Sequence, residues 1–309
     1  MPLSDAARDR GLALATESPD ASAWRAFLHQ ALLYLGASLV LAGVISFVAY
    51  NWSRVGRFGK FAVIELAIVA AAVYAWRVIP RLVGEIALFS AAVLVGALLA
   101  VFGQTYQTGA DPYGLFATWA MLILPWVVAS RFSATWMLLL VLIDTAIVLY
   151  WGQVVSVRDE QQMLWLPVFI GALHFAALAT WQWQRKLSSP WLTERWAQRL
   201  VAVLALYAWW IAAVVTVFAT RRAGLAGILG FALFVAAVVT MMQVYRSPRD
   251  LFMMTIALVA AMALGTAIVG RIVFDVMRVG FFGMMVMAAL VIWEITLLLK
   301  WYRGMRDAT

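Results

Sequence analysis

The chain has 309 residues, of which 65% are hydrophobic and only 12% are charged, with a formal net charge of +8 at pH 7. This composition excludes a soluble domain, because soluble proteins are about half apolar and a quarter charged, so most of the surface must meet lipid. The sequence contains no cysteine, which excludes disulfides, thiol catalysis and cysteine-held metal sites.

The first 28 residues are polar and predict a short cytosolic segment, with a helix from Ser4 to Leu14. The first apolar run begins near Ala31 and is long enough to cross a bilayer, so it predicts an uncleaved anchor and not a signal peptide. We expect residues 29–300 to form a single transmembrane domain and residues 301–309 to form a cytosolic tail.

Ten apolar runs, separated by charged or turn-forming residues, are each long enough to span a bilayer as a helix. They predict an all-α, polytopic transmembrane bundle. The second and third spans, and the fourth and fifth, are separated by so few residues that tight hairpins are expected. The spans are predicted at residues 31–50, 61–79, 82–103, 114–130, 134–151, 163–183, 200–219, 224–243, 251–269 and 279–299.

Two of these spans carry small residues at four-residue spacing, which lets helix backbones approach closely within a membrane. We therefore expect the third and ninth spans to lie in the interior of the bundle. The small residues are Ala92, Gly96 and Ala100 in the third span, and Ala257, Ala261 and Gly265 in the ninth.

The basic residues predict the orientation of the chain. Ten spans place both termini on the same side of the membrane, and 15 of the 23 Lys and Arg residues fall on that side. By the positive-inside rule, both termini are expected in the cytoplasm. The basic residues are scattered in small groups beside apolar runs, which is typical of membrane anchoring, so we expect no nucleic-acid partner.

The loop from Gly103 to Gly114 is the most polar connection and is predicted to face the periplasm, without any Lys or Arg. Gly109 permits a positive φ, and Asp111 can bond nearby backbone ahead of Pro112. Two interpretations stay open: a loop that contacts a small polar solute or gates its passage, and an ordinary turn that caps two helices. The polar residues of the loop are Gln104, Thr105, Tyr106, Gln107, Thr108 and Asp111.

Several segments resemble a known family of bacterial predicted membrane proteins, the domain of unknown function 2157. The resemblance rests on Leu33–Ala37, Phe47–Trp52, Gly56–Lys60 and Gly103–Pro112, and it covers mainly residues 30–130. It implies a multi-pass protein of the bacterial inner membrane. It implies no activity, substrate or catalytic residue.

Two ionisable residues lie near the middle of predicted spans, Asp144 in the fifth and His174 in the sixth. A charge at this depth costs about 2.5 to 3.5 kcal/mol on insertion scales. Asp144 should therefore be protonated, face the interior or meet a partner such as His174. Such a pair could relay protons or bind a cation, or it could be a structural hydrogen bond between helices.

Two glutamates lie one to two turns inside their spans and complete the set of candidate ligand or ion residues. Glu65 could approach Arg57 or Lys60, and Glu294 could approach Lys300 or the cytoplasmic surface. Pairing of this local kind is the alternative to a functional role for both residues.

No enzyme signature is present in the sequence: it contains no zinc-binding His-Glu-x-x-His, no nucleophile elbow, no Walker loop and no dinucleotide fingerprint. We expect no catalytic residue, no cofactor and no metal site, although an intramembrane enzyme with an unusual site stays open.

The leading hypothesis is therefore an inner-membrane protein that binds or transports a small solute or ion at a polar centre inside the bundle. The alternative is a non-catalytic scaffold or accessory subunit of an envelope complex. The partners that these hypotheses name are the lipid bilayer, a small polar solute or a proton, and another membrane protein or a second copy of the chain.

Overall fold

The structure, a computed structural model, describes residues 21–50, 56–106, 109, 111–155, 160–184, 194–218, 224–246, 250–278 and 280–307. Over these residues the chain is helical and has no strand, which confirms the all-α prediction. Helices are expected here because lipid offers no hydrogen-bond partner, so a spanning segment must satisfy its own backbone. The predicted helix from Ser4 to Leu14 lies outside the described residues.

Ten of the described helices are long and apolar enough to cross a membrane, as predicted. They are α2 Ala21–Tyr50, α3 Arg57–Val78, α4 Leu82–Tyr106, α5 Pro112–Ala129, α6 Ser133–Tyr150, α7 Trp165–Gln184, α8 Arg195–Phe218, α9 Gly224–Arg246, α10 Leu251–Arg271 and α11 Phe281–Asp307. The order of the spans agrees with the prediction, but α2 begins well before the predicted start near Ala31.

Short irregular helices extend two of the spans and precede a third. The π-helical turn η1 (Trp151–Val155) follows α6 directly, and η3 (Ile272–Val276) follows α10. The 3-10 helix η2 (Glu160–Leu164) leads into α7. The expected tight hairpins join α3 to α4 and α5 to α6 through three residues each, 79–81 and 130–132.

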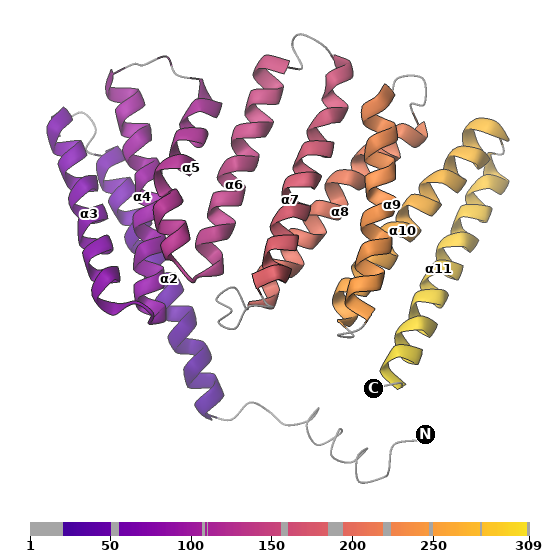
Figure 1. Cartoon of the computed structure of the whole chain (residues 1–309), viewed down its shortest axis with the longest axis horizontal. Helices are drawn as coiled ribbons and strands as arrows, with labels where there is room; N and C mark the ends of the chain where they lie inside the picture. Colours follow the sequence, from indigo (N-terminus) through magenta and orange to yellow (C-terminus); the bar gives the residue numbers. More distant parts are fainter. Residues whose placement is uncertain are drawn as a thin grey trace. The chain divides into compact units, whose positions relative to one another are not determined.

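The chain divides into two compact units, Met1–Gly109 and Ala110–Thr309. In the first unit, coloured indigo to purple in Figure 1, α3 and α4 pack along each other and α2 lies mainly on α4. A small core of Ile64, Leu94 and Val101 holds them together, with Leu41 and Val44 of α2 packed against it. Most other side chains of α2 face outward, as expected of a helix surrounded by lipid.

The second unit, magenta to yellow in Figure 1, is built around α8, which packs against α7, α9 and α10. Half of the most apolar stretch of α8 is buried, the largest buried share among the ten spans. Its buried face is rich in alanine, whose small side chain lets neighbouring backbones come close. These alanines are Ala197, Ala202, Ala205, Ala208, Ala212 and Ala213.

Two glycines on the flanking helices allow the closest approaches to α8. A Cβ atom at Gly171 of α7 would lie 2.4 Å from the ring of Trp209, and one at Gly230 of α9 would lie 2.4 Å from the Cβ of Ala212. The indole Nε1 of Trp209 also donates a hydrogen bond of 3.0 Å to the Val168 carbonyl of α7. Because no Cβ fits at either glycine without a shift, these positions determine how closely α7 and α9 approach α8.

The small-residue faces predicted from spacing have a mixed outcome. In α4, Ala92 and Gly96 are buried while Ala100 is exposed. In α10, Ala257 is fully buried, but the space around Gly265 is open, with nothing within 4 Å of a Cβ placed there. The tightest helix contacts of the second unit are therefore at positions that the four-residue spacing does not indicate.

The close approach at Gly171 gives a first prediction. Gly171→Ala should lower the stability of the purified protein by about 1 to 3 kcal/mol, the usual cost of overpacking a filled interior. The measurement is thermal unfolding in detergent, followed by tryptophan fluorescence. Gly265→Ala is the matched control, because its Cβ meets open space, and it should leave the melting temperature unchanged or slightly higher. Equal behaviour of the two variants would contradict this account of the packing.

Candidate functional site

Asp144 and His174 meet in the second unit. Asp144 lies at the middle of the span Ser133–Val155, and His174 lies near the middle of the span Gln162–Gln184. The His174 Nε2 atom is 3.2 Å from the Asp144 Oδ2 atom, an ion-pair distance, although no hydrogen bond of good geometry joins them. Of the three possibilities expected for Asp144, the structure therefore shows the contact with His174, and we call the two residues the Asp144–His174 pair.

The backbone of α7 determines which ring nitrogen of His174 carries a proton. Its Nδ1 atom lies 2.9 Å from the Ile170 carbonyl one turn earlier. A carbonyl oxygen can only accept, so Nδ1 must be protonated and must donate this bond. A neutral His174 therefore presents the lone pair of Nε2 to Asp144.

This tautomer favours one further proton in the pair. If Asp144 were ionised beside a neutral His174, the carboxylate oxygen and the Nε2 lone pair would repel each other at 3.2 Å. A proton between them removes the repulsion, whether it belongs to a carboxylic acid or to an imidazolium. In either form the pair has no net charge, which is the form that the middle of a bilayer favours.

The two members of the pair differ in their surroundings. The His174 side chain is 1% exposed and the Asp144 side chain is 23% exposed. The second carboxyl oxygen of Asp144, Oδ1, is buried without a hydrogen-bond partner in the described part of the chain. Asp144 is therefore the more accessible member of the pair, and its buried Oδ1 keeps an unused acceptor inside the bundle.

The other two candidate carboxylates are not part of this pair. Glu294 of α11 accepts a hydrogen bond of 2.8 Å from the Thr266 hydroxyl of α10, which joins these two helices. Glu65 belongs to the first unit and is exposed on α3. Among the described residues, no three His, Asp or Glu side chains come together in a way that could hold a metal ion.

The polar loop is described only in part, since Gln107 and Thr108 lie outside the described residues. Gln104 contributes to a cavity of about 270 Å³ between helices of the first unit. The Tyr106 ring stacks on Phe61 with a centroid distance of 6.1 Å and contacts Phe102 at 4.8 Å. Tyr106 is thus part of an aromatic contact between α3 and α4.

Some of the remaining loop residues have the backbone conformation or contact expected from the sequence, and others do not. Gly109 has a φ of +58°, a left-handed conformation of the kind that a glycine permits at this position. Asp111 precedes α5 but makes no side-chain capping hydrogen bond, and Pro112 occupies the first turn of the helix. The Thr105 hydroxyl is buried without a partner in the described part of the chain.

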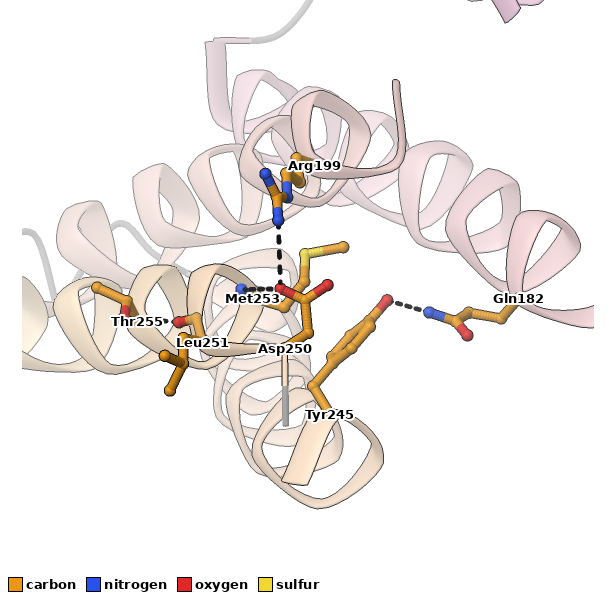
Figure 2. Close-up of polar contacts among 7 residues, drawn as sticks. All are labelled: Gln182, Arg199, Tyr245, Asp250, Leu251, Met253 and Thr255. Atoms are coloured by element: carbon orange, nitrogen blue, oxygen red, sulfur yellow. Dashed lines mark hydrogen bonds and ion pairs between the residues drawn. The ribbon is translucent and has the colours of Figure 1, made fainter. Parts of the chain in front are cut away.

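Sequence reasoning missed a group of polar contacts where α7 and α9 end and α8 and α10 begin (Figure 2). The Gln182 amide donates to the buried Tyr245 hydroxyl. A guanidinium nitrogen of Arg199 lies 3.7 Å from the Asp250 carboxylate, which also accepts the Met253 N–H and so caps α10. The position of Asp250 just before an apolar run could have indicated the cap, but no sequence pattern links it to Arg199.

The comparisons with known proteins agree with this architecture. Residues 3–136 match a family model described as "Predicted membrane protein (DUF2157)", which confirms the resemblance seen in the sequence. No curated protein matches the chain, and no solved structure does. The family match and the ten spans together define a polytopic integral membrane protein.

The proton shared by the pair gives a second prediction, on stability. Asp144→Asn should change the free energy of unfolding by less than about 1 kcal/mol, because the amide can donate to Nε2 and keep the contact. His174→Ala should cost about 2 to 4 kcal/mol, since it opens a cavity and leaves Asp144 unpaired. Both are measured by unfolding in detergent.

The control for the histidine variant is His29→Ala, at the other histidine of the sequence, which is exposed on α2. It should unfold like the unaltered protein. A large loss of stability in Asp144→Asn would contradict this prediction and would place the proton on His174, beside an ionised Asp144 carboxylate.

Proposed function

We propose that this membrane protein binds a proton at the Asp144–His174 pair and carries it across the bilayer, as a proton-linked transporter of a small solute or ion. The observation that carries the proposal is the Nδ1 contact with the Ile170 carbonyl, at 2.9 Å. This contact leaves the Nε2 lone pair facing the Asp144 carboxyl and so supports one exchangeable proton between the two residues.

The location of the pair supports a role in transport more than a purely structural one. A hydrogen bond between membrane helices contributes only about 0.6 to 2 kcal/mol, which apolar packing could replace without an ionisable group. Ionisable residues inside membrane spans commonly mark proton relays and ion pathways. Loss of the shared proton would leave a net negative charge in the membrane, so a proton or another cation must return to the site.

The partial exposure of Asp144 supports this carboxyl as the group through which the pair exchanges its proton with the surroundings. A proton enters and leaves through the Asp144 carboxyl, while the buried His174 ring accepts it at Nε2. The Ile170 carbonyl holds the ring in place during this transfer, because the Nδ1 proton stays engaged. Within the protonated pair, the proton can therefore pass between Asp144 and His174 without a change in net charge, whereas its release through Asp144 leaves the pair negatively charged.

Proton flux into proteoliposomes tests the proposal. A pH-sensitive dye inside the vesicles should report faster acidification, under an imposed gradient, with the protein than in protein-free vesicles. Asp144→Asn should reduce the protein-dependent rate by at least about tenfold, because it removes the exchangeable proton and keeps the fold.

Glu294→Gln is the matched control, since it also replaces a carboxylate within a span by an amide. The amide oxygen can still accept the Thr266 hydroxyl, and its flux should equal that of the unaltered protein. Unchanged flux in Asp144→Asn would remove the pair from the mechanism. No protein-dependent flux at all would favour the scaffold hypothesis instead.

We further propose that the protein resides in a bacterial inner membrane with both termini in the cytoplasm. The bias of the Lys and Arg residues and the even number of spans support this orientation. The orientation determines which leaflet each end of α6 and α7 faces, and therefore which end of the proposed proton path opens to the cytoplasm.

Reporter fusions test the orientation. Alkaline phosphatase is active only after export, so a fusion at Thr309 should be inactive while green fluorescent protein fused there should fluoresce. A phosphatase fusion after Gly109, in the predicted periplasmic loop, is the matched control and should be active. The reverse pattern would overturn the orientation.

A further inference from the structure

A lipid-facing groove runs between α8 and α10 in the second unit, with a volume of about 420 Å³. Its walls are almost entirely apolar. Val203, Tyr207 and Trp210 line it from α8, and Ile256, Val259 and Ala263 line it from α10. Val203, Tyr207 and Val259 are 39%, 58% and 44% exposed, so the groove is open to the surroundings of the protein.

Two arginines continue the α8 wall of the groove toward the start of the helix. Arg195 and Arg199 precede Val203 by eight and four residues, a spacing that places all three on one helix face. Arg195 is exposed, and the Arg199 side chain is 36% exposed. The groove therefore has an apolar body and a cationic end.

The Arg199 guanidinium has donors that its neighbours do not use. Its nearest carboxylate oxygen, on Asp250, is 3.7 Å away, which is longer than a hydrogen bond. Its Nε atom is buried without a partner in the described part of the chain. The guanidinium carbon lies 4.6 Å from the centre of the Phe252 ring at the start of α10, which holds the side chain at the end of the groove.

The electrostatics at this end favour an added anion. The first turns of a helix present a partial positive charge, which acidic residues usually balance. The first turn of α8 begins at Arg195 and contains no acidic residue, and Glu194 directly precedes it. Glu194 and Asp250 balance only part of the charge at this end, since Arg195, Arg199 and Arg246 outnumber them. The exposed Arg246, at the end of α9, adds to the positive charge near this end of the unit.

The length of the groove along α8 is close to the hydrocarbon thickness of one bilayer leaflet. Eleven residues separate Arg199 from Trp210, which corresponds to a rise of about 16 Å along the helix. Half of the hydrocarbon core of a bilayer is about 15 Å. If Arg199 lies at headgroup level, an acyl chain that follows the groove reaches Trp210 near the bilayer centre.

We propose that this groove is a binding site for an anionic phospholipid, whose phosphate contacts Arg199 and Arg195 and whose acyl chain lies between α8 and α10. A guanidinium matches phosphate oxygens with paired donors, and the apolar walls match the chain. In the predicted orientation this end faces the cytoplasmic leaflet, where anionic headgroups attract basic residues. The site is separate from the Asp144–His174 pair and does not depend on its function.

Native mass spectrometry tests the proposal on the full-length protein. The protein is released from micelles that contain equal amounts of phosphatidylglycerol and phosphatidylcholine, and the lipid retained by each molecule is counted. The unaltered protein should retain phosphatidylglycerol in preference. Arg199→Gln should lower this preference by about tenfold, as expected for the loss of one charge-assisted contact.

A second variant tests the apolar part of the site without a change in charge. Ala263→Phe places a ring in the groove and should reduce retention of phosphatidylglycerol as strongly as Arg199→Gln does. Arg131→Gln is the control, because Arg131 is exposed at the turn between α5 and α6, away from this groove. It should retain lipid like the unaltered protein. Only variants whose melting temperature equals that of the unaltered protein are included in the comparison.

Three outcomes would overturn the proposal. The first is equal retention of the two lipids by the unaltered protein. The second is displacement of phosphatidylglycerol by inorganic phosphate, which would indicate a phosphate site that needs no acyl chain. The third is unchanged retention in a folded Ala263→Phe protein, which would show that the groove does not hold the chain.

Discussion

The hydrocarbon core of the bilayer is the constraint on which this structure depends. A backbone N–H or carbonyl without a partner costs several kcal/mol there, so each spanning segment forms its own hydrogen bonds as a helix. Because lipid is as apolar as most of the side chains, burial of leucine or valine contributes little to specific association between helices. Specific association must therefore come from the close approach of small residues and from contacts between polar groups.

The second unit shows both kinds of contact between its helices, small-residue packing and polar contacts. The alanine face of α8 lets α7 and α9 approach until Gly171 and Gly230 leave no room for a Cβ atom. Polar contacts then join pairs of helices at different depths: Asp144 with His174 in the middle of the membrane, and Arg199 with Asp250 at one end. The same group of helices thus holds the Asp144–His174 pair in its interior and a cationic end on its surface.

The sequence was sufficient to predict that Asp144 is protonated, faces the interior or meets a partner, and that His174 lies at a matching depth, because depth follows from position along a span. It could not predict the proton arrangement. That depends on the Ile170 carbonyl, which engages one ring nitrogen and leaves the other for Asp144. Likewise, spacing alone suggested Gly265 as a packing residue, yet the space around it is open.

The sequence by itself determined the number and order of the spans and the tight hairpins, since each of these follows from local hydropathy and turn chemistry. The tertiary structure alone decided which faces of the helices meet. The rotation of a helix about its axis is set by side chains on other helices, distant along the chain. For this reason Arg199, Asp250 and the groove beside them could be found only once α8 and α10 were placed together.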